Sequence, residues 1–206
     1  MKRFIRLISG TTAAIIMLSC SATRNLQDGE FRLAKNKIEV VNDEEFDTGS
    51  LNPYIKQKHK GWSPCLYIYN WTNGKEKGWD KFVRKIGIAP VIYDPVMVDN
   101  SIESIDDHLE YLGYYGSRTT SEIDVRKKNV VVTYKVNLGN RVMIRDIEVN
   151  LPERGEFSDA FRSDSSAFAI RPGDFLSESA LESESVRSAE IMRNKGFYTF
   201  NKHNYF

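Results

Sequence analysis

The chain contains an internal repeat, and this repeat constrains its fold more than any other feature of the sequence. Ile-Glu-Val occurs in NKIEVV (36–41) and again in RDIEVN (145–150), each time among alternating apolar and polar residues. Such alternation is typical of a half-buried β-strand. A glycine followed by two aromatic residues also occurs twice, in YLGYYG (111–116) and NKGFYT (194–199). Glycine is favoured just after a helix, so each repeat is expected to place a strand before a helix.

Two helices are expected between these landmarks in the first repeat. SLNPYIKQ (50–57) is a short helical stretch. A longer helix begins after Asp94, which can cap it, and has Pro95 in its first turn, where a missing N–H costs nothing. Apolar residues then recur at intervals of four and three and form one stripe: Val98, Ile102, Ile105, Leu109 and Leu112.

The second repeat follows the same order with a weaker pattern. EFSDAFRSD (156–164) corresponds to the short helix. Ser179 and Glu182 predict a capping box at the start of the longer helix. Its stripe is small in the middle: Leu181, Ser185, Ser188 and Met192.

Two further strands are expected after the longer helix of the first repeat. They are YYGSRTTSEIDV (114–125) and NVVVTYKVNLG (129–139), and RKKN (126–129) between them is typical of a turn. The sequence therefore predicts an α+β fold of two tandem β-α-α-β-β units, each with two helices on one face of a small sheet. The second unit is expected to lack its last strand, as in a chain truncated inside that unit.

The spacing between the landmarks is longer in the first unit, which predicts an insertion at 58–93. All three tryptophans lie there: Trp62, Trp71 and Trp79. Trp79, Phe82, Val83 and Ile86 fall on one face of a helix, and basic residues occupy other positions. Such a helix either lies at a lipid interface or on a partner protein, or it packs on its own domain. The candidate contact residues are Trp71, Trp79, Lys81, Phe82, Arg84 and Lys85.

The N-terminal segment has the pattern of an export signal. A basic end that includes Lys2 and Arg3 precedes an apolar run over 7–19, which as a helix would cover only about 20 Å. A membrane span needs about 30 Å. Ser19 before Cys20 is typical of a bacterial lipoprotein signal, so Cys20 is expected to carry acyl chains such as palmitate. The alternative is ordinary signal cleavage with no role for Cys20.

Composition argues against several classes of function. Loss of residues 1–19 would leave 26 Lys and Arg against the chain's 28 Asp and Glu, so no nucleic-acid partner is expected. His59, His108 and His203 are scattered, and neither a metal nor a cofactor is expected. His59 and Cys65 could form a nucleophile and base, but no third orienting group accompanies them. The chain is therefore not expected to be an enzyme.

The tandem units and their junction, YKVNLGNRVMIRDIEV (134–149), resemble POTRA domains of the outer-membrane assembly superfamily that includes BamA and TamA. RPGDFLSESAL (171–181) is similar to the approach to the second POTRA helix. The lipoprotein signal and the insertion resemble TamL, the lipid-anchored branch. The expected domain bounds are a signal peptide at 1–19, an anchor linker at 20–29, one unit at 30–139 and a second at 140–206.

The resemblance implies a periplasm-facing protein of the outer membrane, held by its lipid anchor. Its partners would be unfolded outer-membrane proteins or an inner-membrane translocation partner. A client would add a strand to an open sheet edge by β-augmentation. The expected edge residues are Ser117, Arg118, Thr119, Thr120 and Ser121. Two alternatives stay open: the insertion or the neighbouring unit covers this edge, or the chain is a stand-alone scaffold lipoprotein that docks one folded envelope partner.

Overall fold

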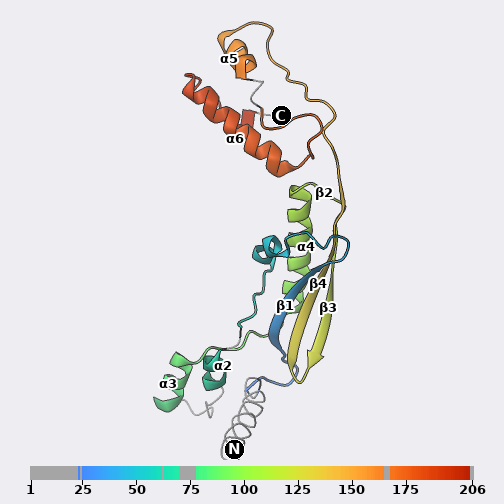
Figure 1. Ribbon diagram of the computed structural model, residues 1–206. Helices are drawn as coiled ribbons and strands as arrows, with labels where there is room; N and C mark the ends of the chain where they lie inside the picture. The colour runs from blue at the N-terminus through green and yellow to red at the C-terminus, as the bar shows by residue number, and fades with distance from the viewer. Residues whose placement is uncertain (1–22, 24, 62, 70–77, 165–167, 205–206) are drawn as a thin grey trace, which may run out of the picture. The chain divides into compact units, whose positions relative to one another are not determined.

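The computed structural model describes residues 23, 25–61, 63–69, 78–164 and 168–204 (Figure 1). The described residues form two compact units. The first contains residues up to Glu39, Thr48–Ile102 and Thr120–Lys135, and the second contains Val40–Asp47, Glu103–Thr119 and the residues from Val136 onward. We keep the names repeat one (30–139) and repeat two (140–206) for the sequence repeats, whose bounds as domains stay a prediction. The fold is α+β, as predicted.

Repeat one contains a three-stranded sheet. Its strands are β1 (Arg32–Val40), β3 (Arg118–Arg126) and β4 (Asn129–Asn137), in the order β1-β4-β3. The hairpin between β3 and β4 turns at Lys127 and Lys128, and both residues have positive φ. Two such residues in succession match the twist of a tight hairpin. The predicted turn at 126–129 is thereby confirmed.

The central strand β4 supplies much of the core. Main-chain bonds from Arg32 N–H to Lys128 C=O and from Val41 N–H to Val136 C=O join the two ends of β1 to β4, so these strands run in the same direction. The alternating side chains of β4 are at most 1% exposed, as the sequence pattern predicts: Val130, Val132, Tyr134 and Val136.

Helix α4 (Pro95–Tyr111) begins where the sequence places it. The Asp94 carboxylate accepts a hydrogen bond from Val96 N–H at 2.9 Å, and it thereby caps the first turn. The residues of α4 that are fully buried are Val98, Ser101, Ile105 and Leu109. Ile102 and Leu112 of the predicted stripe are only half-buried, and Ser101 takes part in the core instead.

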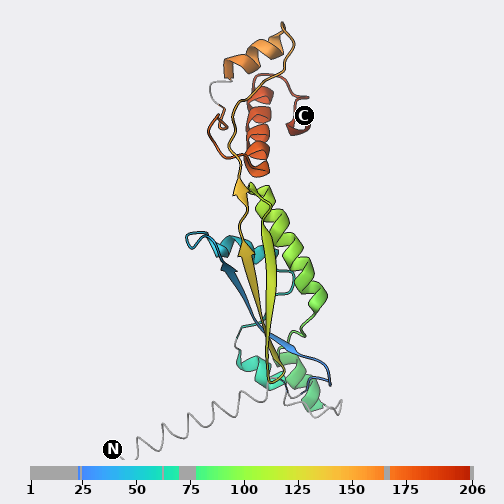
Figure 2. The same ribbon diagram turned by 90° about the vertical axis from the view of Figure 1, so that its right-hand side faces the viewer.

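Ser101 can be buried because its hydroxyl has several partners. It donates to Met97 C=O at 2.6 Å and accepts from Lys56 N–H at 3.0 Å. It also forms a hydrogen bond with Tyr134, and burial raises the pKa of the Tyr134 hydroxyl above its ordinary value. This bonded cluster ties the first half of α4 to β4, and Figure 2 shows that part of the helix beside the sheet.

The insertion contains two helices, α2 (Pro64–Tyr69) and α3 (Gly78–Ile86). The sequence predicted α3 and missed α2. The two pack closely at Gly87, where an added Cβ would lie 2.7 Å from Tyr69 Cα. The short helical stretch expected at 50–57 is a 3₁₀ helix, η1 (Thr48–Tyr54), with Pro53 inside it and Leu51 buried.

The junction between the repeats lies within the second compact unit. The short strands β2 (Tyr114–Tyr115) and β5 (Asn140–Arg141) pair antiparallel there. The Arg141 guanidinium lies 4.0 Å from the centre of the Phe175 ring and 5.1 Å from that of Tyr114, which are favourable cation–π distances. Gly139 fits against the Tyr115 carbonyl, which any Cβ at that position would strike.

Repeat two supplies α5 (Glu156–Asp164) and α6 (Glu178–Asn194), followed by the 3₁₀ helix η3 (Lys202–Asn204). The predicted capping box was wrong, because Ser177 is the N-cap and its hydroxyl accepts from Ala180 N–H. Glu182 instead accepts hydrogen bonds from Lys202 and Tyr111. Both bonds lower the pKa of the Glu182 carboxyl, and the bond from Lys202 has the larger effect. Gly196 ends the helix with a φ of 100°, as its position predicted.

One expected element of repeat two is not a strand. Residues 145–150, the counterpart of β1, join no ladder among the described residues. The physical reason lies in the repeat itself: β1 is held by β4, and repeat two has no described counterpart of β4. A strand without a partner cannot satisfy its main-chain groups by pairing.

We predict that Ile105→Ala lowers the free energy of unfolding by about 2–5 kcal/mol, because it removes a fully buried side chain from the core. Ile123→Ala is the matched control, since Ile123 is 47% exposed, and its effect should be within about 1 kcal/mol. Urea denaturation measures both. Equal losses in the two variants would contradict this assignment of the core.

Candidate functional site

The candidate site is the outer edge of the three-stranded sheet. β3 is an outermost strand in the order β1-β4-β3, so one side of its main chain faces away from β4. Most of its residues from Thr120 to Arg126 are exposed, and Ser121 is half-buried. An edge strand of this kind presents unpaired N–H and C=O groups that another strand can bind.

The opposite edge of the sheet is covered by the insertion and the residues beside it. Leu33 N–H donates to Val91 C=O and Tyr93 N–H donates to Phe31 C=O, each at 2.8 Å. These bonds add the segment at 91–93 to the outer side of β1. The first residues of β1 therefore cannot pair with a further strand on this side.

Side chains near the start of the insertion cover the middle of β1. Asn36 N–H donates to His59 Nδ1 at 3.2 Å, and the Asn36 side-chain amide donates to Gln57 C=O at 2.7 Å. Gln57 Nε2 in turn donates to Ile92 C=O at 2.7 Å. His59 thus has a structural role in covering β1. Among the described residues the insertion covers β1 rather than β3.

The five predicted edge residues have different roles. The Ser117 hydroxyl donates to Tyr114 C=O at 2.7 Å and accepts from Gly139 N–H at 2.9 Å. The buried Thr119 hydroxyl donates to the Asp106 carboxylate at 2.6 Å. Both side chains therefore hold the beginning of β3 in place. Arg118 and Thr120 are exposed, so their side chains stay available to solvent.

The hairpin predicts which main-chain groups of β3 point outward. A two-residue turn at Lys127 and Lys128 makes Arg126 and Asn129 the first bonded pair, and outward and inward groups then alternate along the strand. The N–H and C=O groups of Ser121, Ile123 and Val125 are accordingly expected to face away from β4. The binding property of this edge would lie in its backbone.

Charges on the edge are largely paired. Lys135 bonds to Glu122 at 2.5 Å, and Arg126 lies 3.0 Å from Asp124. Exposed pairs of this kind contribute little to stability. These two pairs offset opposite charges around the centre of β3.

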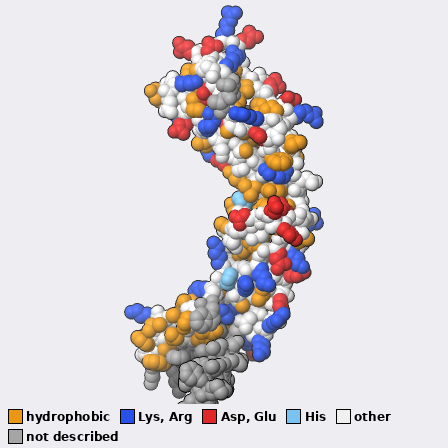
Figure 3. Space-filling view, in the orientation of Figure 1, with side chains coloured by type: hydrophobic (Ala, Val, Ile, Leu, Met, Phe, Trp, Pro, Cys, Tyr) orange, Lys and Arg blue, Asp and Glu red, His pale blue; other side chains and the backbone are white. Residues whose placement is uncertain are grey.

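A second surface of interest lies on α3. Trp79 and Phe82 are 60% and 54% exposed, and their ring centres are 5.9 Å apart. Val83 on the same predicted face is buried and Ile86 is exposed. The basic side chains predicted to accompany them are exposed as well: Lys81, Arg84 and Lys85. Figure 3 shows hydrophobic side chains gathered over this part of the insertion.

The face of α3 has features of both interpretations that the sequence left open. Val83 packs against the protein, whereas the two aromatic side chains remain on the surface. Trp62, Trp71 and Cys20 lie outside the described residues. In the part of the chain that the structure describes, no helix has the length and apolar character needed to cross a membrane. Those residues also contain no cluster of three His, Cys, Asp or Glu side chains that could hold a metal ion.

No protein-family model matches the sequence, and no curated protein matches it. The chain is similar to the crystal structure of POTRA domains 3 to 5 of BamA from Haemophilus influenzae. The identity is 13% and the TM-score is 0.28, over 84% of this chain and 89% of that chain. An identity and a TM-score this low do not assign the chain to a family. The order of elements in repeat one is β1-η1-α2-α3-α4-β2-β3-β4, and it is observed directly in this structure.

We predict that amide hydrogen exchange distinguishes the two edges. The Leu33 N–H should exchange slowly because it is bonded to Val91 C=O. The N–H groups of Ser121 and Ile123 should exchange much faster, because water is their expected partner. Residue-resolved exchange measured by NMR tests this. Slow exchange along all of β3 would mean that its outer edge is covered.

Proposed function

We propose that the chain is a POTRA-like module of outer-membrane protein assembly that binds extended client or partner polypeptides along β3. One observation carries this proposal: β3 is an open edge among the described residues, while the outer edge of β1 is bonded to the insertion. A peptide that adds to β3 gains main-chain hydrogen bonds that depend little on its sequence. Such binding suits a module that meets many different unfolded clients.

The clients and the location belong to the same proposal. The sequence resemblance to POTRA domains suggests unfolded outer-membrane proteins or an inner-membrane translocation partner. Acylation of Cys20 would hold the chain at the outer membrane, facing the periplasm. In this proposal binding requires no covalent chemistry, because a strand exchange between polypeptides makes and breaks only hydrogen bonds and apolar contacts.

A second candidate function is favoured by the surface of α3. Trp79 and Phe82 are exposed next to basic residues, and aromatic side chains are enriched at protein interfaces. A scaffold lipoprotein that docks one folded envelope partner would use such a patch. Capture of many unfolded barrel proteins by crosslinking favours the assembly role, whereas capture of a single folded partner favours the scaffold.

We predict that Ser121→Pro weakens client binding by about tenfold or more. Proline removes the outward N–H and its ring obstructs a neighbouring strand, and the loss of one donor costs about 1–3 kcal/mol. The measurement is fluorescence anisotropy of a labelled, unfolded outer-membrane protein segment with the full, unacylated Cys20→Ala chain.

Ser121→Ala is the matched control for this experiment. It keeps the N–H and removes only the side chain, so its affinity should equal that of the unmodified edge. Circular dichroism of both variants checks that the sheet is intact. If Ser121→Pro binds as well as the control, the client does not use the main chain of β3.

We predict that Trp79→Ala combined with Phe82→Ala reduces retention on liposomes if α3 lies at a lipid interface. These two aromatic side chains are 60% and 54% exposed, and burial of such apolar surface at the interface supports binding to lipid. Flotation of the unacylated Cys20→Ala chain with anionic vesicles measures the retention. Tyr198→Ala, which removes another exposed aromatic side chain, should leave it unchanged. Unchanged retention in the double variant would exclude a lipid role for α3.

A further inference from the structure

The charges of the chain are distributed unevenly, and the insertion is its basic part. Residues 58–93 contain seven Lys and Arg against two Asp and Glu, whereas the rest of the chain contains 22 against 26. The acidic side chain described in the insertion, Asp80, is only 4% exposed. The charged side chains exposed on its described residues are therefore all positive: Lys58, Lys60, Lys81, Arg84 and Lys85.

Helix α3 combines this charge with exposed aromatic rings. Trp79 and Phe82 lie on its surface, and Ile86 beside them is 43% exposed. Basic side chains follow these apolar ones along the same short helix (Figure 3). A helix of this composition has the character of one that lies in a lipid interface, where the rings enter the headgroup region and the basic side chains meet the phosphates.

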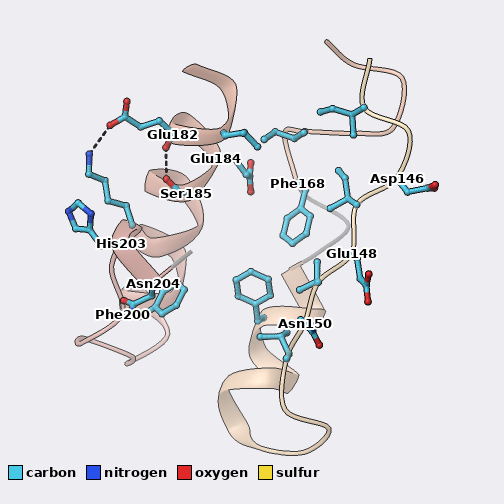
Figure 4. Close-up of a pocket in the computed structure, with 18 of the residues that line it drawn as sticks. Asp146, Glu148, Asn150, Phe168, Glu182, Glu184, Ser185, Phe200, His203 and Asn204 are labelled. Atoms are coloured by element: carbon cyan, nitrogen blue, oxygen red, sulfur yellow. Dashed lines mark hydrogen bonds and ion pairs between the residues drawn. The ribbon is translucent and has the colours of Figure 1, made fainter. Parts of the chain in front are cut away.

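A second apolar surface has the opposite charge. It is a groove in the second compact unit, between residues 144–151 and α6, and several phenylalanine rings line it (Figure 4). Its basic lining residues are Lys202 and His203, against four acidic ones: Asp146, Glu148, Glu182 and Glu184. Charge complementarity with anionic headgroups therefore favours α3 and not this groove.

The segment that follows Cys20 attaches to the end of the sheet where the β3–β4 hairpin turns. Leu26 is buried, and Lys128 Nζ donates to Leu26 C=O at 3.2 Å and to Gln27 C=O at 3.3 Å. Leu26 follows Cys20 by six residues. Acylation of Cys20, which is part of the proposed function, would therefore hold this end of the sheet within about 20 Å of the membrane, the reach of an extended chain of that length.

The insertion returns to the same end of the sheet. Arg32 N–H donates to Lys128 C=O, and the next residue, Leu33, donates its N–H to Val91 C=O. Ile86, the last residue of α3, precedes Val91 by five residues, which span at most about 18 Å. The chain thus keeps α3 close to the anchored end, where the effective concentration of lipid headgroups is high.

We propose that α3 and the basic residues of the insertion bind the surface of a membrane that contains anionic phospholipid. Trp79 and Phe82 would enter the headgroup region, while Lys81, Arg84 and Lys85 pair with lipid phosphates. A helix of nine residues is too short to cross a bilayer, so the contact is peripheral. This inference assigns the surface of α3 to lipid instead of a folded partner, and it rests on the proposed function only for the position of the anchor.

Binding of the full, unacylated Cys20→Ala chain to two kinds of vesicle tests this contact. One kind is phosphatidylcholine alone, and the other is phosphatidylcholine mixed with phosphatidylglycerol, whose headgroup is anionic. The chain should bind the mixed vesicles about tenfold or more tightly, because each basic residue near an anionic surface strengthens binding severalfold. Added salt should reduce this difference, since it screens the charges.

Replacement of the basic residues of α3 localises the contact. Lys81→Gln, Arg84→Gln and Lys85→Gln together should weaken binding to the mixed vesicles about tenfold or more. Equal losses in the control variant would overturn the proposal, because the general charge of the chain would then explain the binding. This control removes three exposed basic charges from repeat two and should keep nearly all of the affinity: Arg145→Gln, Arg154→Gln and Arg171→Gln.

The fluorescence of Trp79 reports the contact without any change to α3. Trp62→Phe combined with Trp71→Phe leaves Trp79 as the one tryptophan of the chain. Its emission should move to shorter wavelength when the mixed vesicles are added, because the ring leaves water for the headgroup region. An unchanged emission spectrum on vesicles that retain the chain would show that another surface binds them and would contradict the proposal.

Two further measurements distinguish this contact from the proposed function. Ser121→Pro, which alters only β3, should leave vesicle binding unchanged. Mass spectrometry of the chain from cells shows whether Cys20 is acylated, and vesicle binding by the Cys20→Ala chain does not depend on that result. Equal binding to the two kinds of vesicle, an absence of binding, or a folded envelope protein that occupies α3 in place of lipid would each exclude the assignment.

Discussion

Main-chain hydrogen bonding at strand edges is the constraint on which this structure depends. The N–H and C=O groups of every strand need hydrogen-bond partners, and the strand edges of this chain differ in the partners that they have. β4 is paired on both sides and its core residues are buried. β1 is paired with β4 on one side and with the segment at 91–93 on the other. β3 and the segment at 145–150 each keep an open side among the described residues.

The insertion determines which edge remains available. Its last residues and Gln57 with His59 bond to β1, so a client strand cannot add there without displacing them. The same insertion holds α3 so that Val83 is buried while Trp79 stays exposed. One segment therefore closes an edge of the sheet and adds an aromatic surface, and its loss would change both properties together.

Local sequence signals predicted the elements whose formation depends on neighbouring residues. Three such features depend on residues only a few positions apart: the Asp94 cap, the alternation of β4 and the turn at 126–129. Other errors arose where distant contacts decide, whereas the wrong helix cap at Ser179 lies only two residues from the true cap, Ser177. Ser101 is buried because Lys56 and Tyr134 reach its hydroxyl, and the cover on β1 comes from residues more than twenty positions away. The segment at 145–150 has the pattern of a strand but joins no ladder among the described residues, where repeat two has no counterpart of β4.

The most direct test of the account compares photo-crosslinking from the two edges of the same sheet. A photoreactive amino acid is placed at Thr120 on β3 or at Lys35 on β1, two exposed positions, in cells that produce the full chain. The account predicts crosslinks to several unfolded outer-membrane proteins from Thr120 and few or none from Lys35. Equal capture from both positions, or capture from Lys35 alone, would contradict the claim that β3 is the edge that binds.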